Sequence, residues 1–127
     1  MRLSLFLIVF LGGGLGAAMR HGVNLLMARW LGTAFPYATM TENVTGSLVM
    51  GLLTGYFAFA GEIPQHWRLF LTTGILGGYT TFSAFSLDTA LLYERGEVGL
   101  AALYVVSSVG LSVAGLFAGL AIVRHFT

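Results

Sequence analysis

Long apolar stretches alternate with short polar segments along this chain. The apolar stretches run from about residue 3 to 28, 37 to 60, 67 to 92 and 98 to 123, and the segments between them hold charged residues, glycine and proline. A helix that crosses a bilayer needs about 20 mostly apolar residues. The pattern therefore predicts an all-α integral membrane protein with four transmembrane helices in a single domain, residues 1–127.

Aromatic and charged residues mark the predicted helix ends. Trp30, Trp67 and Tyr93 lie there, as expected for the aromatic belt of a membrane protein. Arg2, which precedes the first apolar stretch, leaves a cleaved signal peptide as an alternative. That stretch continues through a glycine cluster to Arg20 without a clear cleavage site, so we expect the first helix to remain in the protein.

The composition excludes several classes of protein. The chain is 57% hydrophobic and only 9% charged, whereas an ordinary soluble domain is about 25% charged. It has no cysteine, so it offers no disulfide framework and no thiolate chemistry. A net charge of +1 provides no basic face for nucleic acid. These features exclude a soluble globular domain and make a nucleic-acid partner unexpected.

The arginines divide almost evenly between the two predicted sides of the membrane. All six basic residues are arginine. With four crossings, one side holds three of them and the other holds two, or three if Arg20 faces the same water. Because orientation follows the Lys/Arg bias between loops, this flat distribution predicts dual topology, although a small imbalance can also decide orientation.

Four helices are too few to enclose a pore, so we expect the functional unit to be an oligomer. The chain has 18 glycines, and small-xxx-small spacings recur among them. Such spacings let helix backbones approach closely in lipid. They occur at Gly12/Gly16, Gly51/Gly55, Gly74/Gly78 and Gly115/Gly119.

Hydroxyl groups recur every four residues on the last predicted helix. Tyr104, Ser108 and Ser112 share one face, about 6 Å apart along the axis. One interpretation is that each serine bonds a carbonyl of its own helix one turn back. Three hydroxyls in register favour a polar track through the membrane instead.

The second predicted helix carries a similar stripe of Thr39, Asn43 and Ser47. Asn43 is the most informative of the three because a buried carboxamide has two donor hydrogens and an acceptor oxygen to satisfy. It could line a polar path, or it could join two helices by hydrogen bonds.

The third apolar stretch contains paired glycines followed by paired threonines, from Gly74 to Ser86. This composition makes a poor helix, so we expect a break near the middle of the span. Carbonyl groups released at such a break can hold a cation, and oxygen ligands suit Na⁺ rather than a transition metal. Phe82 and Phe85 follow on one face, and their electropositive ring edges could face an anion. Ordinary packing of the two rings is the alternative.

At this segment the chain resembles the Fluc (CrcB) family of fluoride ion channels. The most specific motif is Gly-Gly-x-Thr-Thr-Phe-Ser-x-Phe at residues 77–85. Supporting motifs are Gly-Ala-x-x-Arg at 16–20 and Asn-x-x-Gly-Ser at 43–47, and the spaced hydroxyls and the total length also agree.

The resemblance implies a dual-topology, antiparallel homodimer in the bacterial inner membrane, with two pores that let cytoplasmic fluoride leave passively. It also implies a structural Na⁺ at the dimer centre, held by the main-chain carbonyls of Gly77 and Thr80, and Arg20 at a wet vestibule. The fluoride pathway would comprise Asn43, Phe82, Phe85, Tyr104, Ser108 and Ser112, with Thr39 and Ser83 as weaker members.

Glu42 departs from the family pattern, which usually has a small or apolar residue beside the pore asparagine. An ionised carboxylate there would repel fluoride, so we expect Glu42 to be protonated through burial or to point away from the path. Replacement by valine should leave permeation intact or raise it. Asp88, the other acidic residue deep in a predicted span, receives no role from the sequence.

Two other functions compete with a channel. A small multidrug transporter also has four helices and exchanges protons for cationic drugs, but it needs a carboxylate on the first helix, where this chain has none. A structural subunit would use the polar stripes as packing contacts. An enzyme is disfavoured because Asp88 has no histidine or serine partner at helical spacing that would form a dyad.

Overall fold

The computed structural model describes residues 2–127, and this part of the chain is helical without any strand. Helices α1, α2 and α6 are each long and apolar enough to cross a membrane. The prediction of an all-α membrane protein is thus confirmed, while a fourth crossing stays a prediction. The elements in chain order are α1 (Arg2–Leu31), α2 (Tyr37–Ala60), α3 (Gln65–Leu69), the π-helix η1 (Phe70–Leu76), α4 (Gly77–Tyr79), α5 (Phe82–Glu94) and α6 (Val98–Phe126).

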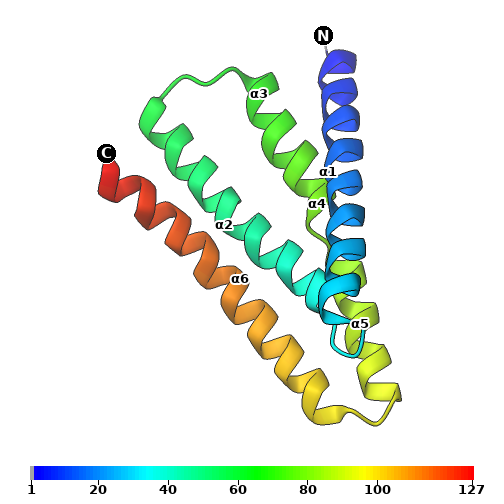
Figure 1. Ribbon diagram of the computed structural model, residues 1–127. Coiled ribbons are helices and arrows are strands. Elements are labelled where there is room, and N and C mark those ends of the chain that lie inside the picture. The colour runs from blue at the N-terminus through cyan, green and yellow to red at the C-terminus, as the bar shows by residue number, and fades with distance from the viewer. Residues whose placement is uncertain (1) are drawn as a thin grey trace.

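The chain runs back and forth between two ends of the molecule (Figure 1). Helix α2 lies alongside α6, while α1 lies against η1 and α4. The two termini and the loop after α2 lie at one end, and the loops that follow α1 and α5 lie at the other. The broken segment from α3 to α5 therefore extends over the same length as the three long helices.

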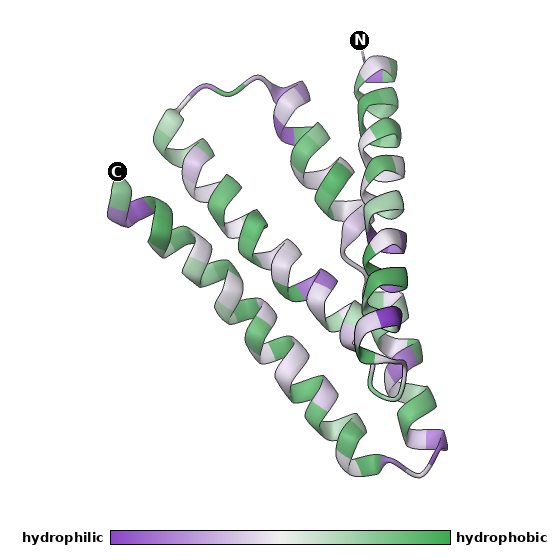
Figure 2. Ribbon diagram, viewed as in Figure 1, coloured by the Kyte–Doolittle hydropathy of each residue, from purple (hydrophilic) through white to green (hydrophobic). Residues whose placement is uncertain are grey.

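The outer faces of the helices are apolar. Hydrophilic residues gather mostly at the helix ends and loops, while hydrophobic residues cover most of the long helices (Figure 2). Phe6 of α1, for example, is 74% exposed. Large side chains this exposed would be unfavourable in water, but they suit contact with lipid.

Glycine permits close packing between α2 and α6. A methyl group added at Gly51 would overlap the Leu116 carbonyl, and one added at Gly119 would overlap the Leu48 carbonyl. Lipid provides no hydrophobic driving force for helices to associate, so the close approach of helix backbones is a main source of stability for the helix bundle. Both glycines belong to the small-xxx-small spacings in the sequence.

A second glycine contact joins α1 to the π-helix. A Cβ atom at Gly12 would lie 2.8 Å from the Phe70 carbonyl oxygen and 3.0 Å from Gly74 Cα. Gly16, one turn further along α1, is in similarly close contact with Ile75. A π-helix holds one extra residue per turn and is often found near functional sites. This one ends at Leu76 and is followed directly by the short helix α4.

Candidate functional site

The third predicted span is broken in its middle, at Thr80 and Thr81. Helix α4 ends at Tyr79, and both threonines are extended, with φ/ψ of −85°/156° and −152°/124°. Helix α5 then begins at Phe82, with Thr81 as its N-cap, because Thr81 Oγ1 accepts a hydrogen bond from the Ala84 amide at 3.1 Å. Threonine is a favoured N-cap residue, so this part of the sequence favours a new helix start.

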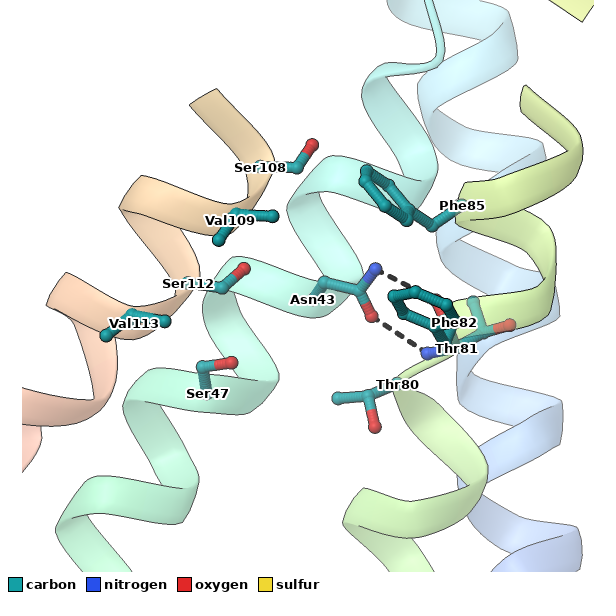
Figure 3. A pocket seen from close by; sticks show the side chains of 10 residues that line it. All are labelled: Asn43, Ser47, Thr80, Thr81, Phe82, Phe85, Ser108, Val109, Ser112 and Val113. Carbon is teal, nitrogen blue, oxygen red and sulfur yellow. Dashed lines mark hydrogen bonds between the residues drawn. The ribbon is translucent and has the colours of Figure 1, made fainter. Parts of the chain in front are cut away.

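Asn43 of α2 holds the extended segment in place. Its Nδ2 donates to the Thr81 carbonyl at 3.0 Å, and its Oδ1 accepts from the Thr81 amide at 2.8 Å (Figure 3). Asn43 thus replaces the helical partner that the Thr81 amide loses where the helix stops, and it adds a second bond to the Thr81 carbonyl. Asn43 therefore joins two helical segments by hydrogen bonds. The same residue also lines a cavity, and its place in a polar path stays a prediction.

Two carbonyl groups lose their usual helical donors at the break. In an α-helix a carbonyl accepts from the amide four residues later. The Thr81 amide donates to Asn43 instead of to Gly77, and the Ala84 amide donates to the Thr81 side chain instead of to Thr80. Main-chain oxygens freed in this way suit a hard cation such as Na⁺. They belong to Gly77 and Thr80, the two residues that the resemblance implies, and a Na⁺ at this place stays a prediction.

A cavity of about 310 Å³ lies beside the break, between α2, α5 and α6 (Figure 3). Phe82 and Phe85 of α5 lie on one side of it, with ring centroids 5.5 Å apart. Phe82 is 77% exposed, whereas Phe85 is buried against Tyr104, at a ring separation of 5.2 Å. The full lining comprises Asn43, Ser47, Thr80, Thr81, Phe82, Phe85, Ser108, Val109, Ser112 and Val113.

Two serines of α6 face this cavity with unused hydroxyl groups. The Oγ atoms of Ser108 and Ser112 are buried and have no hydrogen-bond partner within residues 2–127. Their neighbour Ser107 behaves differently, since it donates to the Leu103 carbonyl at 2.6 Å. Bonding to the helix's own carbonyls therefore accounts for Ser107 but not for the two serines in the stripe. A buried polar group without a partner calls for an explanation, and a polar ligand provides one.

Tyr104 lies on the same helix face but outside the cavity lining. It is fully buried, at 0% exposure, and its hydroxyl donates to Asp88 Oδ2 at 3.1 Å. Asp88 also lines a cavity of about 80 Å³ near the loop between α1 and α2. Asp88 received no role from the sequence. Its place three residues after Phe85, in an apolar stretch, was the signal that could have identified it.

The remaining predicted side chains, Arg20, Thr39 and Ser83, do not line the cavity. Arg20 of α1 donates from Nε to the Gly78 carbonyl at 3.0 Å, at the end of α4. Thr39 is buried on α2. Ser83 is exposed, and its hydroxyl lies 3.4 Å from Thr81 Oγ1. The structure thus brings Arg20 and Ser83 to the break and places Thr39 within the bundle.

Glu42 precedes Asn43 on α2 but does not line the cavity. It is 1% exposed, and its Oε2 has no hydrogen-bond partner among the described residues. The expectation that this side chain points away from the path agrees with this position.

Comparison with known proteins supplies the family. A family model described as CrcB-like protein, Camphor Resistance (CrcB), matches residues 7–120. The chain belongs to the CrcB family. Every residue of this CrcB site, from Arg20 to Ser112, lies inside the matched range, and the resemblance seen in the sequence is confirmed.

Several relatives of this CrcB chain match it over nearly their whole length. A protein of Nitrobacter hamburgensis, named fluoride-specific ion channel FluC 2, is 68% identical over 122 residues, which cover 96% of this chain and 98% of that protein. A fluoride-specific ion channel FluC of Rhodopseudomonas palustris (strain BisB5) is 71% identical over the same shares. One from Methylobacterium nodulans is 62% identical over 94% of this chain and 96% of its own.

Proposed function

We propose that this CrcB protein is a fluoride-selective ion channel and not an enzyme. The observation that carries the proposal is the pair of unpartnered hydroxyls, Ser108 and Ser112, which face two phenylalanine rings across one cavity. The relatives named as fluoride-specific channels support it, because they align over the entire site. An alternative, the small multidrug transporter, gains no support from the long helix α1, which carries no acidic residue.

The chemistry of the cavity suits a small, strongly hydrated anion. Hydroxyl donors can replace water around fluoride, and phenylalanine edges carry partial positive charge. No full positive charge lines the cavity, so an anion is not held too tightly to leave. Arg20 lies nearby at the end of α4 and can attract anions without occupying the path.

Passive flow through such a channel would remove fluoride from the cytoplasm. Hydrogen fluoride crosses membranes as a neutral molecule, then dissociates inside the less acidic cell, and the anion is trapped. The membrane potential, negative inside, drives an anion outward at about 2.3 kcal/mol per 100 mV. The channel would thereby protect a bacterium against fluoride from its place in the inner membrane.

The functional unit that we propose is an antiparallel homodimer of chains that each cross the membrane four times. The flat distribution of arginines supports insertion in both orientations. The exposed ring of Phe82 and the exposed Gly77 and Ser83 lie at the break, where a second copy would cover them. Each copy would contribute to two pores, and Na⁺ would join the copies through the carbonyls of Gly77 and Thr80.

Anion efflux from proteoliposomes tests the function. The purified protein is reconstituted with fluoride or chloride inside, and a selective electrode records the loss of each. We expect rapid fluoride loss with chloride retained, and a large decrease in the Phe85→Ala and Ser108→Ala variants. Equal loss of both anions, or no flux from a well-folded protein, would overturn the proposal. Proton-driven uptake of a cationic dye would instead favour a multidrug transporter.

A single cysteine tests the orientation, since the chain has none of its own. Thr127→Cys in intact cells is labelled with a membrane-impermeant maleimide before and after the membrane is opened. Dual topology predicts that about half of the protein reacts in intact cells. Labelling of all or none of it would exclude the antiparallel arrangement.

A further inference from the structure

Glu42 is a buried acidic group that the proposed pathway does not use. Its side chain is 1% exposed, and Oε2 is completely enclosed without a hydrogen-bond partner in the described part of the chain. No ion pair to Glu42 occurs within residues 2–127. An isolated carboxylate in such a place is highly unfavourable, whereas its protonated form is not.

The groups around Glu42 do not compensate a negative charge. The nearby cation is Arg20 of α1, whose Nε is already bonded to the Gly78 carbonyl. A second acidic residue, Asp88 of α5, adds negative charge near Glu42, and Tyr104 of α6 donates a hydrogen bond to Asp88. Tyr79 of α4 contacts α2 at Thr45 instead of at Glu42, since its hydroxyl lies 2.9 Å from Thr45 Oγ1. One arginine and one further acidic residue therefore act on Glu42 with opposite signs.

The position of Glu42 also couples it to the pathway. The next residue, Asn43, lines the cavity and holds the break through Thr81. At a separation of about 10 Å and an effective dielectric constant near 20, a charge on Glu42 would lower the occupancy of an anion beside Asn43 roughly tenfold.

We propose that Glu42 is a proton-binding site within the channel: the protein conducts fluoride when this carboxyl is protonated and conducts less when it is ionised. The inference rests on the proposed channel function. It gives the chain a means to respond to acid conditions, under which hydrogen fluoride enters cells most readily.

The test is the pH dependence of fluoride efflux, with equal pH inside and outside the proteoliposomes, at about pH 6, 7.5 and 9. Leakage of hydrogen fluoride is subtracted with protein-free liposomes at each pH. We expect the rate of the unmodified protein to fall roughly tenfold as pH rises and the rate of Glu42→Gln to stay constant. Glu62→Gln, which removes an exposed loop carboxylate, serves as the matched control and should keep the fall.

Three results would overturn the inference. They are a flat profile for the unmodified protein, the same fall in Glu42→Gln, or a fall abolished only by Asp88→Asn. A lack of flux even at low pH would instead reject the channel function. Should Glu42→Gln fail to fold, infrared spectra of the unmodified protein and of Glu42→Asp provide a second measurement. The band of a protonated carboxylic acid must be present at low pH, disappear as pH rises, and shift in the aspartate variant.

Discussion

Replacing Asn43 by alanine should release the extended segment between α4 and α5. The change removes two hydrogen bonds, of 2.8 and 3.0 Å, and leaves the amide of Thr81 without a partner, while its carbonyl keeps the first bond of α5. Leaving a buried polar group unpaired costs about 1–3 kcal/mol. The unpaired amide, together with the second hydrogen bond lost at the carbonyl, gives an expected local cost of about 2–4 kcal/mol.

Hydrogen exchange measures this cost directly. A loss of about 2–4 kcal/mol corresponds to exchange of the Thr81 amide about 30- to 1,000-fold faster. Asn43→Asp keeps the oxygen that accepts from this amide, so most of the protection should remain. Thr45→Ala, on the exposed side of the same helix, should leave Thr81 unchanged. Unaltered protection of Thr81 in Asn43→Ala would refute the role of Asn43 as the support of the break.

Three further results are expected. Gly16→Ala should lower the unfolding temperature in detergent, because the added methyl group would overlap the Ile75 carbonyl at a cost of about 1–3 kcal/mol. Gly14→Ala is the control and should leave the unfolding temperature unchanged, because nothing lies within 4 Å of its added methyl group. Ser112→Ala should slow fluoride efflux, whereas Ser107→Ala should not, because only Ser107 already has a backbone partner. Phe82→Leu should reduce fluoride flux with little effect on stability, as this ring is mostly exposed; normal flux would remove the ring edge from the pathway.

The helices could largely be predicted from the sequence because apolar length decides them. The second predicted span, 37–60, coincides with α2, and the paired glycines and threonines correctly indicated the break at Thr80. These features depend on local composition, since glycine weakens a helix and threonine caps one. The local sequence pattern was sufficient wherever residues adjacent in sequence decide the backbone conformation.

Contacts between distant segments could not be predicted in the same way. The bond from Asn43 to Thr81 joins residues 38 positions apart, and Tyr104 meets Asp88 across 16. The π-helix lies in close contact with glycines of α1, and no local pattern reveals this contact. The hydroxyl stripe was visible in the sequence. Only the structure shows that the Ser107 hydroxyl bonds its own helix, whereas the Ser108 hydroxyl has no partner among the described residues.

The position of the two termini limits how such a protein could arise from a fused gene. Both termini lie at the same end of the chain (Figure 1). In an antiparallel pair, the last residue of one copy and the first residue of the other would therefore lie on opposite sides of the membrane. A simple head-to-tail gene duplication could not produce that pair with a short connecting loop. A tandem protein would require a connecting segment that itself crosses the bilayer, which implies an additional hydrophobic helix of about 20 residues.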